Sequence, residues 1–108
     1  SIARAEYSDR VARFQAEDAR LAARQNADGA LRAVTTAERA IAIAHEAVAV
    51  SDEDLRVIRE RYRLGVAIIL DVITSQISSD QARVDLVRAR YSYLVARAEL
   101  ESILGREL

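Results

Sequence analysis

The chain has 108 residues, of which 51% are hydrophobic, 31% charged and 5% aromatic, and it contains no proline, cysteine, methionine or tryptophan. The absence of proline and the presence of only three glycines leave few places for turns, which argues against an all-β or α/β fold. All 16 basic residues are arginine, and with 17 acidic residues they give a net charge of −1 without charged blocks, which argues against a nucleic-acid binder.

The first predicted element is a helix over about residues 4–63, roughly 90 Å long at ~1.5 Å per residue. Gly29 lies inside it and costs a helix roughly 1 kcal/mol without having to break it. Ser51 followed by three acidic residues could start a new helix. A seven-residue hydrophobic repeat passes through both places unbroken, so we expect one continuous helix.

The glycines then mark a turn and an end. Gly65 is the best turn candidate, which predicts a connection over residues 64–67 and a second helix over about 68–104, ~55 Å long. The β-branched run at residues 68–73 could be read as a strand, but it has no partner strand and continues the heptad pattern. Gly105 is expected to cap the second helix at its C-terminus.

Each predicted helix carries two hydrophobic rows, and each row repeats every seven residues. On the first helix the rows are Val34, Ile41, Val48, Leu55 and Tyr62, and Ile43, Val50, Val57 and Leu64. On the second they are Leu70, Ile77, Val84, Tyr91 and Ala98, and Val72, Ser79, Leu86, Tyr93 and Leu100. This period indicates left-handed supercoiling, and the offset of two residues, about 200°, places the rows of one helix on nearly opposite faces.

These patterns predict an all-α fold, a long antiparallel coiled-coil hairpin without an internal domain boundary. Each helix requires neighbours on two sides, whereas a simple coiled coil requires one. The first ~25 residues should extend beyond the end of the second helix without a partner. We therefore expect the sequence to be a piece of a larger protein, and no apolar run approaches the ~18 residues of a membrane-spanning helix.

No arrangement of residues typical of catalysis or cofactor binding is found. His45 is the single histidine, and a metal site needs several converging ligands, so we interpret it as a surface residue. The acids Asp52, Glu53 and Asp54 lack the spacing of a calcium loop and are interpreted as helix-dipole residues, with Asp52 four residues before Arg56 in the order that favours an ion pair. We expect no enzymatic activity, no cofactor and no metal.

The turn carries apolar side chains where a hairpin tip should be exposed. Val66, Ile68 and Ile69 would be costly in water unless another protein or a symmetry mate covers them. The alternative is that they pack into the end of the hairpin itself. Asp71 can likewise be a first-turn acid that complements the helix dipole.

The tip sequence resembles the TolC-like outer membrane factor family, the exit ducts of tripartite efflux pumps and type I secretion systems. The resemblance is strongest from Ala40 to Gly105. It rests on Arg61-Tyr62-Arg63-Leu64-Gly65-Val66-Ala67 and Leu70-Asp71-Val72, followed by Ala82, Leu86-Val87, Ala89-Arg90-Tyr91, Tyr93-Leu94 and Leu104-Gly105.

The resemblance implies a homotrimer with a hollow α-helical barrel in the periplasm, attached to the outer membrane through β-strands missing from this chain. The chain would be the hairpin of the second structural half, and its partners would be a periplasmic adaptor protein and an inner-membrane transporter. Docking and gating would involve Tyr62, Arg63, Leu64, Gly65, Val66 and Ala67, and Asp71 would belong to an acidic ring at the tunnel entrance. Some members carry a second acid where this chain has Thr74, and Arg or Thr where it has Val66 and Ala67, so neither a cation-binding constriction nor a salt-bridged lock is implied here.

Three functions remain open at the level of the sequence. The first is a passive duct gated at the tip by adaptor binding, as a population shift between closed and open tips. The second is the hairpin of an adaptor protein, which flanking lipoyl-like β segments would favour. The third is a generic coiled-coil oligomerisation module, which requires only one apolar seam.

Overall fold

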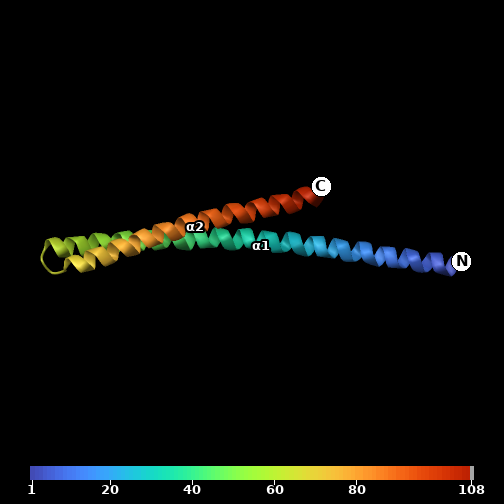
Figure 1. The fold of residues 1–108 in the computed structure, drawn as a ribbon, viewed down its shortest axis with the longest axis horizontal. Coiled ribbons are helices and arrows are strands. Elements are labelled where there is room, and N and C mark those ends of the chain that lie inside the picture. Colours follow the sequence, from blue (N-terminus) through green and yellow to red (C-terminus); the bar gives the residue numbers. More distant parts are fainter. Residues whose placement is uncertain (108) are drawn as a thin grey trace.

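Two long antiparallel helices make up the fold in the computed structural model, which describes residues 1–107 (Figure 1). Helix α1 spans Ile2–Arg63 and helix α2 spans Ile69–Glu107. The molecule is a rod with extents of 94 × 20 × 15 Å. The prediction of an all-α, extended helical hairpin is confirmed.

Both helices are continuous where the sequence left a choice. Gly29 and Ser51 lie inside α1, and the β-branched stretch after Ile68 forms the first turns of α2. The strand interpretation of that stretch is therefore wrong. The seven-residue spacing of apolar side chains outweighs local β propensity because it gives each helix a continuous contact with its neighbour.

The predicted helix end at Gly105 is also wrong, because α2 continues to Glu107. A C-terminal glycine cap requires a left-handed backbone, and within the described part of the chain the only glycine with positive φ is Gly65. A Cβ at Gly105 would meet no atom within 4 Å, and Gly105 is accommodated as an ordinary helical residue. A glycine inside a helix costs about 1 kcal/mol relative to alanine, which does not have to break the helix.

One hydrophobic row from each helix forms the contact between them, which we call the seam. Its best buried side chains are small or apolar, and they are Ala30, Ala37 and Leu55 from α1 with Ala82, Leu86 and Ala96 from α2. Half-buried Val34, Ile41, Val48, Val72, Tyr93 and Leu100 fill the positions between them. The alternation of large and small residues lets the two backbones approach closely and fit knobs into holes.

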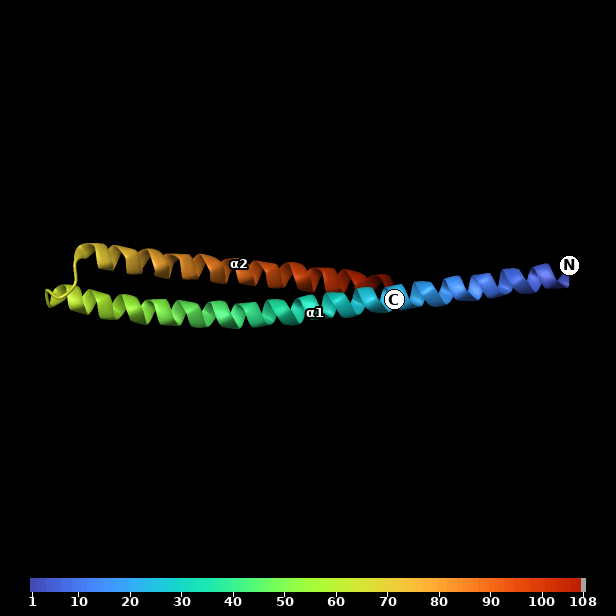
Figure 2. The same ribbon diagram turned by 90° about the horizontal axis from the view of Figure 1, so that it is seen from below.

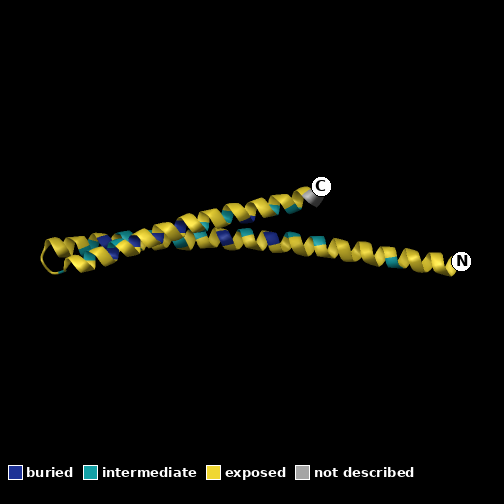
Figure 3. Ribbon diagram, in the orientation of Figure 1, coloured by how far each residue is buried: buried dark blue, intermediate teal, exposed yellow. Residues whose placement is uncertain are grey.

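Most of both helices is exposed (Figure 3), and the other row of each helix lies mostly in this exposed part. We call these the free rows. They consist of Ile43, Val50, Val57 and Leu64 on α1 and of Leu70, Ile77, Val84 and Tyr91 on α2, and all except the half-buried Val57 are exposed. Ile43 keeps 71% of its surface exposed and Tyr91 keeps 68%. The hairpin therefore covers one apolar face of each helix and leaves another uncovered.

The N-terminal part of α1 extends beyond the end of α2, as predicted (Figures 1 and 2). Residues 1–22 are exposed except for half-buried Val11. Exposed Tyr7, Phe14 and Leu21 recur every seven residues along this segment. Among the described residues, neither helix contains a stretch both long and apolar enough to span a bilayer.

Candidate functional site

The hairpin tip begins where α1 is closed by a Schellman motif. The backbone N–H of Val66 donates to the carbonyl of Arg61 at 2.9 Å, and that of Gly65 donates to the carbonyl of Tyr62 at 3.1 Å. This pattern requires a left-handed residue after the cap, and Gly65 supplies it with φ of +79°. The left-handed backbone therefore explains why this position holds a glycine.

Charged side chains stabilise this end of α1. Arg61 and Arg63 lie in its last turn, where positive charge complements the helix dipole. Arg63 also forms an ion pair with Glu60 one turn earlier. The hydrogen bond that Arg63 donates to the Glu60 carboxylate raises the pKa of the Arg63 guanidinium.

Asp71 caps the start of α2. The backbone N–H of Ile68 donates to Asp71 Oδ2 at 3.1 Å, and the N–H of Asp71 donates to the carbonyl of Ile68 at 3.0 Å. An acidic side chain at the third helical position that reaches back to the residue before the helix is half of a capping box. The interpretation of Asp71 as a first-turn acid is confirmed, and its place at a tunnel entrance stays a prediction.

The tip side chains are turned outward. Val66 is 73% exposed and Ile68 is 62% exposed, and Tyr62, Leu64 and Ile69 are exposed as well. Only Ala67 is half-buried among the residues that connect the helices. The alternative in which Val66, Ile68 and Ile69 pack into the end of the hairpin is therefore wrong, and a compact apolar surface lies at the tip.

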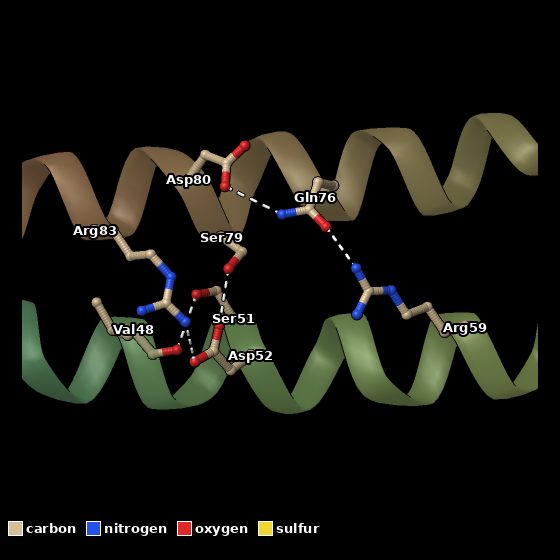
Figure 4. A network of polar contacts seen from close by, with 8 residues as sticks. All are labelled: Val48, Ser51, Asp52, Arg59, Gln76, Ser79, Asp80 and Arg83. Atoms are coloured by element: carbon tan, nitrogen blue, oxygen red, sulfur yellow. Dashed lines mark hydrogen bonds and ion pairs between the residues drawn. The ribbon is translucent and has the colours of Figure 1, made fainter.

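Above the tip, polar contacts cross the seam between the two helices (Figure 4). Ser79, which is 1% exposed, donates its hydroxyl hydrogen to Asp52 Oδ1 at 2.8 Å, and Arg83 donates to Asp52 Oδ2 at 2.7 Å. Buried Ser75 makes a similar bond to Asp54 Oδ2 at 3.0 Å. We call these five residues the polar clasp. The hydrogen bond from Ser79, helped by the charge of Arg83, lowers the pKa of Asp52.

The polar clasp does not follow from the sequence patterns. The prediction that Asp52 pairs with Arg56 is wrong, because Arg56 pairs with Glu53 at 2.6 Å and Asp52 binds across the seam. The hydrogen bond from Arg56 lowers the pKa of Glu53. The available signal was that serine occupies two seam positions of α2 opposite acidic residues of α1.

A groove of about 580 Å³ lies beside the clasp, between the two helices. Four arginines (Arg56, Arg59, Arg63 and Arg83) and two carboxylates (Asp52 and Glu60) line it together with Leu55, Gln76 and Ser79. Buried Leu55 and Ser79 supply its deepest residues. The candidate site thus has two parts, an apolar tip and a cationic groove, and His45 lies outside the groove as an exposed residue of α1.

Arg59 differs from the other arginines of the groove. It donates to the neutral side chain of Gln76 at 2.7 Å, and Gln76 in turn donates to Asp80 at 3.1 Å. Arg56, Arg63 and Arg83 each form an ion pair with a carboxylate of this chain. Figure 4 shows Arg59 and Gln76 reaching toward each other from opposite helices.

Comparison with known proteins gave one family. The model of the family described as outer membrane efflux protein matches residues 1–106. Searches of curated proteins and of solved structures gave no match.

Proposed function

Because the chain belongs to the outer membrane efflux protein family, we propose that it forms the periplasmic tunnel portion of an outer membrane channel for tripartite efflux or type I secretion. The channel is a passive conduit without catalysis. Three copies associate, and the tip hairpin is gated when a periplasmic adaptor binds it. The inner-membrane transporter of the same system supplies the cargo.

The observation that carries this proposal is the pair of free rows. A generic coiled-coil module needs one apolar seam, yet each helix here keeps a second row of large side chains in water. Fully burying one such side chain contributes about 1.5–3 kcal/mol, so covering both rows strongly favours lateral association. Helices packed on both sides form a wall, and a wall of helices is what a tunnel requires.

The angular positions of the rows support a curved wall. At about 100° per residue, the α1 free row with its neighbours Ala40 and Ala47 is centred about 110° from the seam. On α2 the free row with Ile73 and Leu94 is centred about 150° from the seam, in the opposite direction across the hairpin. Each helix has one neighbour across the seam and one across its free row. Measured on the face opposite the groove, the angle between the directions to these two neighbours averages about 160° over α1 and α2, which is less than half a turn. The wall therefore curves toward that face, which becomes the inside of the tube.

This curvature supports the assignment of Asp71 to the tunnel entrance. Asp71, Ser78 and Asp85 lie seven residues apart on the face of α2 that becomes the inside. Asp71 is the member nearest the tip. Its capping bond to Ile68 uses Oδ2, so Oδ1 remains available to face the passage.

The tip residues then lie where a partner from the inner membrane would meet the tunnel. Exposed Leu64, Val66 and Ile69 offer apolar surface to an adaptor, with Tyr62, Arg63 and Ala67 beside them. Covering this surface would shift the tips toward their open arrangement, since a ligand favours the conformation that it binds better.

Cysteine cross-linking tests the docking assignment. In the protein as expressed from its own gene, a cysteine replacing Val66 should cross-link to the co-expressed adaptor. A cysteine replacing Ala42, which is exposed on α1 about 35 Å from the turn, is the matched control and should not cross-link. The assignment is wrong if the pump works and the Val66→Cys variant gives no more adduct than the control.

A further inference from the structure

The groove beside the polar clasp carries more positive than negative charge, with four arginines against two carboxylates among its lining residues. Three of the arginines are already neutralised by carboxylates of this chain. Arg59 has only the neutral amide of Gln76. The positive charge without a counter-charge in the groove therefore belongs to Arg59.

The bond to Gln76 also fixes the position of Arg59. A guanidinium has five N–H donors in a rigid plane, so the single bond to Gln76 leaves donors for a carboxylate. Because Gln76 is itself bonded to Asp80, the amide is oriented before any ligand arrives. A positioned guanidinium loses less side-chain entropy on binding than a mobile one.

The groove stays accessible when hairpins pack side by side. On α1 the groove residues Arg56 and Arg59 lie on one side of the seam, and the free row lies on the other. On α2, Gln76 and Arg83 are about 100° from the free row. Lateral packing through the free rows thus leaves the groove open on the convex, outer face of the wall.

We propose that this groove binds a carboxylate-bearing helix of the adaptor, with the aspartate or glutamate side chain received by Arg59. This inference rests on the proposed function and names the chemistry of the partner. A volume of about 580 Å³ accommodates side chains presented by a helix while the helix itself stays on the rim. Buried Leu55 lines the floor of the groove.

Charge substitutions test the proposal. They are made in the protein as expressed from its own gene, and binding of the purified adaptor is measured by surface plasmon resonance. Arg59→Glu should weaken binding about tenfold or more, because it replaces a charge-assisted hydrogen bond by repulsion. The salt dependence of binding should fall at the same time. Arg24→Glu, at an exposed position of α1 outside the groove and five heptads before Arg59, is the matched control and should bind like the unsubstituted protein.

A second variant separates binding from folding. Gln76→Glu supplies Arg59 with a carboxylate from within the hairpin, so adaptor affinity should fall. The new ion pair with Arg59 replaces the hydrogen bond that Gln76 donates to Asp80, and the helix content measured by circular dichroism should stay that of the unsubstituted protein. If Arg59→Glu and Gln76→Glu both bind as tightly as Arg24→Glu, the inference is overturned and the proposed function stands. If the unsubstituted protein does not bind the adaptor, the proposed function fails and this inference fails with it.

Discussion

Gly65 is the one residue whose type the backbone of the hairpin requires. Its φ of +79° costs a residue with a Cβ about 1–2 kcal/mol. Gly65→Ala should therefore lower the free energy of unfolding by about 1–2 kcal/mol, even though a Cβ there would meet no atom within 4 Å. Urea unfolding followed by circular dichroism measures the difference.

Gly29 provides the matched control, because it lies inside α1 with the same open surroundings. Alanine favours a helix interior over glycine by about 1 kcal/mol, so Gly29→Ala should raise the free energy of unfolding. The two substitutions are chemically identical and should act in opposite directions. A change of the same sign in both would contradict the backbone explanation for Gly65.

The same comparison shows how far residue type predicts structure. Glycine permits a left-handed backbone but does not require one, so residue type alone predicts a helix end equally well at Gly65 and at Gly105. At Gly65 the tip bonds from Val66 and Gly65 close α1. At Gly105 the helix continues to Glu107. The difference depends on hydrogen bonds after the glycine, which composition does not reveal.

At the scale of the elements, the polar clasp makes the association of the helices depend on pH. Because Ser79 and Arg83 lower the pKa of Asp52 in the folded state, ionised Asp52 stabilises the hairpin above the unfolded-state pKa of about 4. That contribution is lost as the pH falls through the lowered pKa. We expect the melting temperature to decrease as the pH falls below about 4.

Substitution of Asp52 isolates its part of this effect. Asp52→Asn should lower the melting temperature at pH 7 and should flatten its decrease below pH 4, since the amide does not titrate. Glu46→Gln, at an exposed position of the same helix, serves as the comparison and should leave the Asp52 contribution intact. Equal pH profiles for the two variants would show that the clasp does not contribute.

The contacts of the polar clasp could not be predicted from the sequence. Periodicity predicts which residues of each helix face the seam, but it does not pair them across it. Asp52 and Ser79 are 27 residues apart, and their contact depends on the register of α1 against α2. Once the turn is fixed at Gly65, the register follows, because the pairs Asp52–Arg83 and Arg59–Gln76 are each displaced by seven residues along their helices.

At the scale of the whole molecule, the two rows on each helix are predictable from the sequence, and the structure divides them into a seam and a free row. Which row would be buried was not predictable, because both repeat every seven residues with similar side chains. The free rows have no partner in a single chain. In the proposed function, neighbouring helices of the tunnel wall cover them, and a single hairpin does not contain those neighbours.

The α1 free row therefore gives the test of assembly. Replacing Ile43, Val50 and Val57 together by glutamine should abolish the trimer, measured by analytical ultracentrifugation of the detergent-solubilised protein. Helix content should persist, because Ile43 and Val50 lie outside the seam and Val57 lies only at its margin, where it is half-buried. Glutamine is also a good helix former. Each replaced side chain removes about 1.5–3 kcal/mol of apolar burial from every copy.

A matched triple variant uses Thr35, Ala42 and Ala49, which have the same seven-residue spacing on an exposed face of α1, about 100° from each of the two rows. Their replacement by glutamine should leave the trimer intact. Assembly that survived the loss of the free row would mean that one seam is enough. The hairpin would then be a single-seam oligomerisation module, because a closed wall of helices requires the second contact on every helix.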